Sequence, residues 1–176
     1  MKYFFLLLTV FIDLTVFSQE EVSTTENTLI PEGIAIHPKN ETIYISSIAK
    51  HKIIKIKNRE VSNFIEEGES GFLEGLGLKV DVKRNLLWAL SNQKQGKWYL
   101  SQIHGFDLNT KEKKYFHLIK DTIPHLLNDL VVSPHDNLFI TDTYFSAIYK
   151  FNISSQQLEL FIKSSKLCGS AFASES

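Results

Sequence analysis

The sequence predicts an all-β chain that folds as a β-propeller with about three four-stranded blades. Short apolar runs, rich in residues that pack well on a pleated surface, alternate with polar turns as in antiparallel strands. The same pattern then occurs three times along the chain, at intervals of 44 and 52 residues. Four strands per unit at a period of roughly 40–50 residues is typical of propeller blades.

The third unit shows the pattern most clearly. Its apolar runs are Leu130–Val132, Leu138–Ile140, Ile148–Phe151 and Leu158–Ile162. Between the first two runs, Pro134 presets its backbone angle, and Asp136 and Asn137 tolerate tight conformations, which together predict a turn. The polar pair Asn128-Asp129 stands at the entrance of the first run.

Two earlier units follow the same plan. The first comprises Pro31–Pro38, Thr42–Ser46, Lys52–Ile56 and Val61–Ile65, and the second comprises Gly75–Asp81, Leu86–Leu90, Ile103–Leu108 and Tyr115–Ile119. In the second unit an insertion, Asn92–Ser101, delays the third strand. Superposition of the units places Glu32, Leu76 and Asn128 at equivalent positions, one per blade, where propeller loops converge on one mouth of the central channel.

Two of these entrances carry a family resemblance. Pro31-Glu32-Gly33-Ile34-Ala35 and Leu127-Asn128-Asp129-Leu130-Val131-Val132, with Pro134 shortly after, resemble the senescence marker protein/gluconolactonase-like superfamily. That superfamily of six-bladed, calcium-dependent propellers also holds strictosidine synthase-like proteins and paraoxonases. The resemblance covers about Leu29 to Ile162 and implies a calcium-dependent hydrolase acting on a small lactone or ester.

The resemblance also implies site residues. Glu32 matches a metal ligand, Asn128 matches a residue that binds the metal or contacts substrate, and Asp129 matches a ligand of a second, structural calcium. Carboxylate and amide oxygens suit Ca²⁺ or another hard divalent cation. The alternatives are a solvated turn residue for Glu32 and a capped strand entrance for Asn128-Asp129. His125, three residues before Asn128, is the further candidate for substrate binding.

The sequence also departs from the family pattern at its metal ligands and catalytic residues. The superfamily's remaining ligands come from its fourth and fifth blades, so the residues present form half a site. No catalytic residue is assigned, because the positions that match paraoxonase-like catalytic histidines appear as Glu74 and Gln93. We therefore expect the hydrolase to be inactive in the sequence as given. A non-catalytic extracytoplasmic propeller that binds a partner or small ligand is the alternative.

Length and segment composition complete the expectations. The chain has 176 residues, about half of what six blades need, which indicates a fragment or, alternatively, a half-propeller that closes as a homodimer. Residues 1–19 are a signal peptide or an uncleaved anchor, 20–28 a disordered lead-in, 29–163 the partial propeller and 164–176 an irregular tail. We expect an extracytoplasmic protein, with no membrane contact beyond the N-terminal segment.

Charge and cysteine content exclude two classes. The formal net charge is −1 and no basic groove is evident, which excludes a nucleic-acid-binding surface. Cys168 is the sole cysteine of the sequence, so an intrachain disulfide is excluded as well.

Overall fold

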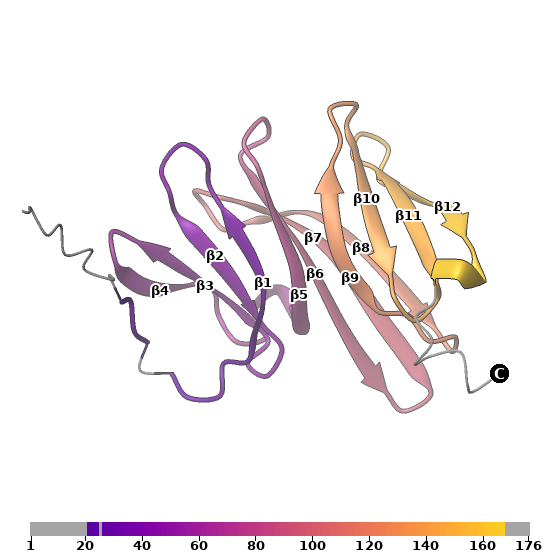
Figure 1. Cartoon of the computed structure of the whole chain (residues 1–176), viewed down its shortest axis with the longest axis horizontal. Coiled ribbons are helices and arrows are strands. Elements are labelled where there is room, and N and C mark those ends of the chain that lie inside the picture. The colour runs from indigo at the N-terminus through magenta and orange to yellow at the C-terminus, as the bar shows by residue number, and fades with distance from the viewer. Residues whose placement is uncertain (1–20, 25, 168–176) are drawn as a thin grey trace, which may run out of the picture.

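The computed structural model describes residues 21–24 and 26–167 as three four-stranded antiparallel sheets (Figure 1). The strands of each sheet are hydrogen-bonded in chain order, so each sheet is a simple meander. We call the sheets blades 1, 2 and 3. The predicted signal peptide and Cys168 lie outside the described residues.

The strands match the predicted runs, with shifted ends. Blade 1 contains β1 (Pro31–Ile36), β2 (Ile43–Ser47), β3 (Lys52–Lys57) and β4 (Glu60–Ile65). Blade 2 contains β5 (Glu74–Asp81), β6 (Leu86–Gln95), β7 (Trp98–Asp107) and β8 (Lys113–Asp121). Blade 3 contains β9 (Leu127–Val132), β10 (Asn137–Asp142), β11 (Ala147–Asn152) and β12 (Gln157–Lys163). Single 3₁₀ turns lie at Glu69–Gly71 and Ser165–Leu167.

The blades pack face to face through two apolar cores. Strand β6 contributes to both, because successive side chains of a strand point to opposite faces. Leu87 and Ala89 join the core between blades 1 and 2, whereas Leu86, Trp88 and Leu90 join the core between blades 2 and 3. Blade 2 is therefore covered on both faces.

The innermost strands lie side by side, β1 against β5 and β5 against β9. Each carries a β-bulge near its start. Between two consecutive paired positions the innermost strand has two residues, whereas the second strand opposite has one. The bulged pairs are Glu32-Gly33, Leu76-Gly77 and Asn128-Asp129. Glu32, Leu76 and Asn128, which the sequence superposition placed at equivalent positions, are thus structurally equivalent. A bulge changes the direction in which the side chains of its residues point.

Two glycines let the innermost strands approach closely. A Cβ at Gly33 would lie 2.0 Å from the Leu76 carbonyl oxygen, and a Cβ at Gly77 would lie 2.6 Å from the Asn128 carbonyl oxygen. Both distances are far below van der Waals contact, so these positions require glycine. The equivalent residue in blade 3 is Asp129.

The insertion in the second unit is regular structure. Strands β6 and β7 each have ten residues, and the insertion lengthens their hairpin, which turns at Gly96 with a positive φ of 59°. In Figure 1 this hairpin extends beneath blade 3. At its base the buried Asn92 accepts a hydrogen bond from the Leu127 N–H and donates one to the Leu127 carbonyl, each at 2.9 Å.

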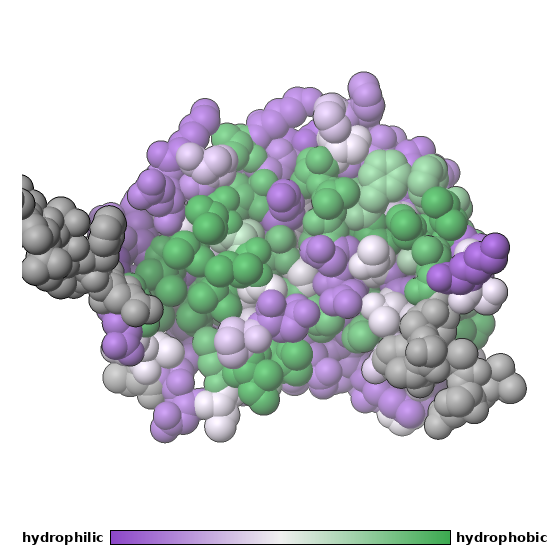
Figure 2. Space-filling model, in the orientation of Figure 1, coloured by the Kyte–Doolittle hydropathy of each residue, from purple (hydrophilic) through white to green (hydrophobic). Residues whose placement is uncertain are grey.

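Blades 1 and 3 each leave one face open. Ile34 and Ile36 of β1 are 62% and 56% exposed, and Val131 of β9 is 53% exposed. Hydrophobic side chains gather over β1–β2 and over β9–β10 on the side turned to the viewer (Figure 2). Nothing in the described part of the chain covers these side chains.

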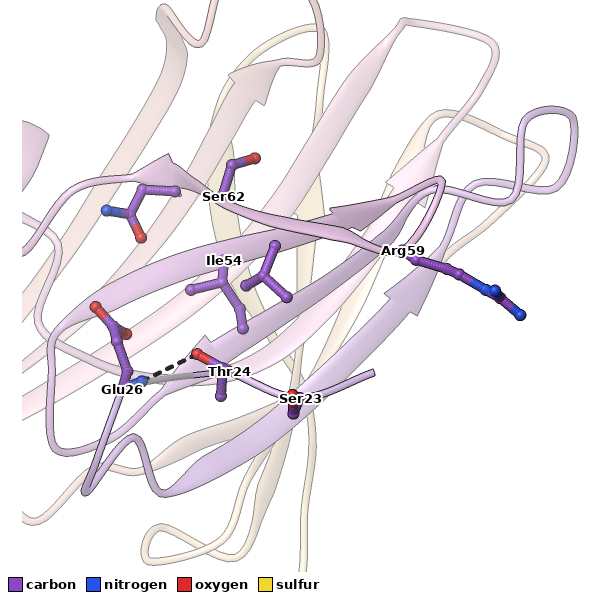
Figure 3. Close-up of a pocket in the computed structure, with 8 residues that line it drawn as sticks. Ser23, Thr24, Glu26, Ile54, Arg59 and Ser62 are labelled. Carbon is purple, nitrogen blue, oxygen red and sulfur yellow. Dashed lines mark hydrogen bonds between the residues drawn. The ribbon is translucent and has the colours of Figure 1, made fainter. Parts of the chain in front are cut away.

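The segment before β1 lies against the outer part of blade 1. Glu26 of this segment accepts a hydrogen bond from the buried Lys52 ammonium at 2.5 Å. Figure 3 shows the shallow hollow beside it, with the Arg59 side chain pointing away from Glu26 and Thr24. Within residues 21–24 and 26–167, no helix is long and apolar enough to cross a membrane.

Candidate functional site

The three bulges meet at a hollow of about 390 Å³, which we call the central hollow. It draws its lining from the innermost strand of every blade: Glu32, Gly33, Ile34, Gly77, Leu78, Asn128 and Asp129. The structure therefore brings together all three residues that the sequence predicted as metal ligands. Residues 32 and 128 are 96 positions apart in the chain, and only the blade arrangement makes them neighbours.

The central hollow concentrates negative charge. Partial burial raises the pKa of Glu32 above its ordinary value, and the nearby Asp129 carboxylate raises this pKa further. A nearby negative charge disfavours ionisation of the Glu32 carboxyl group, whereas a cation placed beside it would favour ionisation. The electrostatics of the hollow thus fit a bound cation.

Several oxygens of the central hollow are available to a ligand. Within the described residues, the Glu32 carboxylate accepts no hydrogen bond. Asn128 donates its side-chain N–H to the Thr143 hydroxyl at 3.2 Å, which orients its amide oxygen away from that contact. Asp129 Oδ1 accepts the Leu130 N–H at 2.8 Å, so the strand-cap interpretation applies to one oxygen of this carboxylate.

Hydroxyl groups on the second strands hold two of the bulges. In blade 1, the Ser46 hydroxyl accepts the Gly33 N–H at 2.9 Å and donates to the Leu76 carbonyl of blade 2 at 2.6 Å. In blade 3, Thr141 occupies the position of Ser46 and accepts the Asp129 N–H at 3.0 Å. These contacts fix the backbone that carries Glu32 and Asp129.

His125 lies apart from the central hollow. Its ring is buried, with Nδ1 2.5 Å from Asp142 Oδ2 and Nε2 3.8 Å from Asp121 Oδ2. Asp142 also accepts the N–H groups of Leu126 and Phe145 at 2.9 and 3.0 Å, so His125 helps to fix the segment that leads into β9. A role for His125 in substrate binding stays a prediction.

The oxygen donors of the central hollow are fewer than a complete calcium shell needs. Calcium takes six to eight oxygen ligands, and the hollow offers two carboxylates and one amide oxygen. Among the described residues, no group of three or more His, Cys, Asp and Glu side chains could hold a metal ion. The residues present fit a hard cation in type and charge, and further ligands must complete the shell.

One polar cluster escaped the sequence analysis. His104 Nε2 lies 3.0 Å from Gln102 Oε1 and 3.1 Å from the Ser91 hydroxyl, and all three side chains are buried. Burial, and secondarily the Lys113 charge, lowers the pKa of His104 to about 3. The aromatic rings of Phe72 and Phe106 pack beside it, so this neutral imidazole belongs to the core between blades. The alternation of side chains along β7, which places His104 on an inward face, was the sequence feature that could have predicted its burial.

Comparison with solved structures supports the fold. A gluconolactonase from Xanthomonas campestris superposes with a TM-score of 0.55 at 15% identity, over 77% of this chain and 48% of that chain. Hydrazine synthase from Kuenenia stuttgartiensis gives a TM-score of 0.58 at 12% identity, over 84% and 40%. The WD40 repeats of RRP9 give 0.55 at 11% identity, over 80% and 41%.

The chain is a partial β-propeller. It spans about half of the length of the gluconolactonase and less of the other two proteins. The predicted fold class, all-β with three four-stranded blades, is confirmed. At these identities the similarity concerns the fold, which lactonases share with propellers of unrelated function. No protein-family model matches the sequence, and no curated protein sequence matches it either.

Proposed function

We propose that this chain contributes the metal-binding entrances of a calcium-dependent, extracytoplasmic hydrolase of gluconolactonase type, acting on a lactone or ester. One observation carries the proposal: Glu32, Asn128 and Asp129, from two blades, converge on the central hollow, where burial and, secondarily, the Asp129 carboxylate raise the pKa of Glu32. The fold shared with a gluconolactonase supports the class of protein and leaves the substrate open.

The residues have separate tasks in this proposal. Glu32 and Asp129 hold Ca²⁺ or another hard divalent cation, and the Asn128 amide oxygen is a further ligand or a contact to the substrate. A bound divalent cation polarises a carbonyl and lowers the pKa of bound water. A hollow of about 390 Å³ lies within the usual size range of small-molecule sites.

The first test is calcium titration of the purified chain by calorimetry. Glu32→Gln and Asp129→Asn keep side-chain shape and remove charge, so each should weaken binding by about tenfold or more. Glu74→Gln is the matched control, because Glu74 starts β5 but does not line the central hollow. The proposal is refuted if calcium does not bind, or if it binds both charge variants as tightly as the parent chain.

Hydrolysis is the second test. The residues present form half of a site, so hydrolysis is expected only where the remaining ligands are supplied; release of acid from a panel of simple aldonolactones should then depend on calcium and stop when a chelator is added. Calcium binding without hydrolysis would instead favour the alternative, a propeller that binds a partner or ligand. The open apolar faces of blades 1 and 3 are the observation in favour of that alternative.

A further inference from the structure

We propose that a second copy of this chain covers the open faces of blades 1 and 3, so that two half-propellers close into a six-bladed ring. Blade 2 lies between blades 1 and 3 in Figure 1, and the hydrophobic side chains of both outer blades appear on one side of the molecule (Figure 2). A single partner on that side can therefore cover both. We call each contact between blade 3 of one copy and blade 1 of the other a seam.

The open face of blade 1 has the chemistry of a blade interface. Register places Ile34, Ile43, Ile45, Ile54 and Ile56 on this face, opposite to the face that packs on blade 2. The two isoleucines of β2 occupy the positions of Leu87 and Ala89 in β6, which receive blade 1. Blade 1 is thus built to receive a preceding blade.

The open face of blade 3 is the matching half. Phe139 and Thr141 of β10 occupy the positions of Tyr44 and Ser46, which blade 1 presents to blade 2. Val131 is exposed beside them, and Phe139 packs edge-on against the exposed Phe161 at 5.0 Å. Along the second strands, a seam therefore repeats the contact that already joins consecutive blades within the chain.

The number of blades agrees with a second copy of this chain as the partner. The chain covers 48% of the gluconolactonase chain, so two copies supply about one complete propeller of that size. Three blades occupy one side of the channel, and a two-fold axis along the channel generates the other three. Such an axis makes both seams identical, as a closed dimer requires.

One residue makes the seam differ from the internal junctions. Gly33 and Gly77 let the next innermost strand approach closely, but Asp129 occupies this position in blade 3. Its Cβ requires the next strand to lie farther away, and by blade equivalence that strand carries Glu32 of the second copy. The seam therefore sets Asp129 of one copy beside Glu32 of the other, at the channel mouth.

This arrangement also completes the central hollow. If the proposed function is correct, the ring offers a cation two copies each of Glu32, Asn128 and Asp129, in place of the partial shell of one chain. The segment before β1 covers the outer part of blade 1 around Ile54, so the seam forms along β1 and β2 (Figure 3). The site would then be shared between subunits.

The mass of the purified chain in solution, measured by light scattering at micromolar concentration, tests the dimer. The parent chain should have twice the monomer mass. Ile34→Asp and Val131→Asp each place a charge in both seams and should give monomers. Leu118→Asp is the matched control, because Leu118 is 41% exposed on β8, away from either seam.

A mixing experiment distinguishes the ring from other dimers. In a mixture of Ile34→Asp and Val131→Asp chains, a mixed ring has one seam with both substitutions and one seam with none, so dimers should partly return. A dimer formed through blade 1 faces alone would persist in Val131→Asp and would not be rescued by mixing. A monomeric parent chain, or failure of mixing to restore any dimer, overturns the proposal.

Metal dependence keeps this proposal separate from the proposed function. The masses are measured both with calcium and with a chelator. A dimer that obeys the mixing rule but binds no calcium would remove the hydrolase proposal and leave the ring. A monomer that binds calcium, with loss in Glu32→Gln, would remove the ring and leave the metal site.

Discussion

The buried His104 should make the stability of the protein fall steeply below neutral pH. Its pKa is lowered from 6.5 to about 3 in the folded state, chiefly by burial. A histidine held neutral in this way stabilises the fold above its unfolded pKa of 6.5, and the contribution is lost as pH falls from there toward 3. A pH of about 5 lies about 1.5 pH units below the pKa of the histidine in the unfolded chain. Protonation of the unfolded chain therefore lowers the free energy of unfolding by about 2 kcal/mol at this pH.

The assay is urea unfolding at about pH 7.5 and about pH 5, at one protein concentration. The variant is His104→Phe, which suits the neighbouring rings of Phe72, Phe106 and Phe116 and leaves Gln102 bonded to Ser91 at 2.9 Å. The parent chain should lose about 2 kcal/mol more than the variant between these pH values.

His117→Phe is the matched control. His117 is half-buried on the same strand pair, and its pKa is lowered by partial burial alone. Its replacement should therefore change the pH dependence less than the replacement of His104. If the parent chain and His104→Phe lose the same stability on acidification, the argument from burial is wrong.

Three substitutions test the junctions between blades. Gly33→Ala puts a Cβ 2.0 Å from a carbonyl oxygen and should destabilise the chain by several kcal/mol in thermal unfolding, on the order of an overpacked core; an unchanged midpoint would show that the strands separate freely. Asn92→Ala removes two buried hydrogen bonds to Leu127 and should cost about 2–4 kcal/mol, whereas a cost below about 1 kcal/mol would contradict this. Arg84→Met removes the ion pairs of Arg84 with Asp81 and Asp136 and should lower the free energy of unfolding by about 1–3 kcal/mol. This difference should be smaller in high salt, because salt screens ion pairs.

The blade plan could be predicted because it depends on local patterns. Apolar runs and turn residues recur at matched spacing, and strand alternation fixes which residues face a neighbouring blade. The same superposition equated Glu32 with Asn128, and both lie at bulges around one hollow.

Contacts between blades could not be predicted in this way. The approach of Gly33 to Leu76, and of Asp129 to Glu32, depends on how the blades pack, which spacing along one chain does not encode. The contact between His125 Nδ1 and Asp142 Oδ2 likewise depends on how the chain folds and not on spacing along it. The insertion Asn92–Ser101 was predicted to delay the third strand of its blade. In the structure these residues belong to β6, the turn and β7, and they continue the pairing of the two strands, which spacing alone did not show.

Blade 2, covered on both faces, has a consequence for the folding of the chain. Each blade is a local meander whose stability depends on its nearest neighbours, as in a short linear array of repeats. The middle unit has two such neighbours and the end units have one. Cooperative opening should therefore begin at the ends, and amide hydrogens of β6 should exchange most slowly, near the free energy of global unfolding. The folding stability of the chain is therefore that of three consecutive blades whose two outer blades open first. If both outer faces were covered, as in a closed ring, every blade would have two neighbours and this difference would disappear.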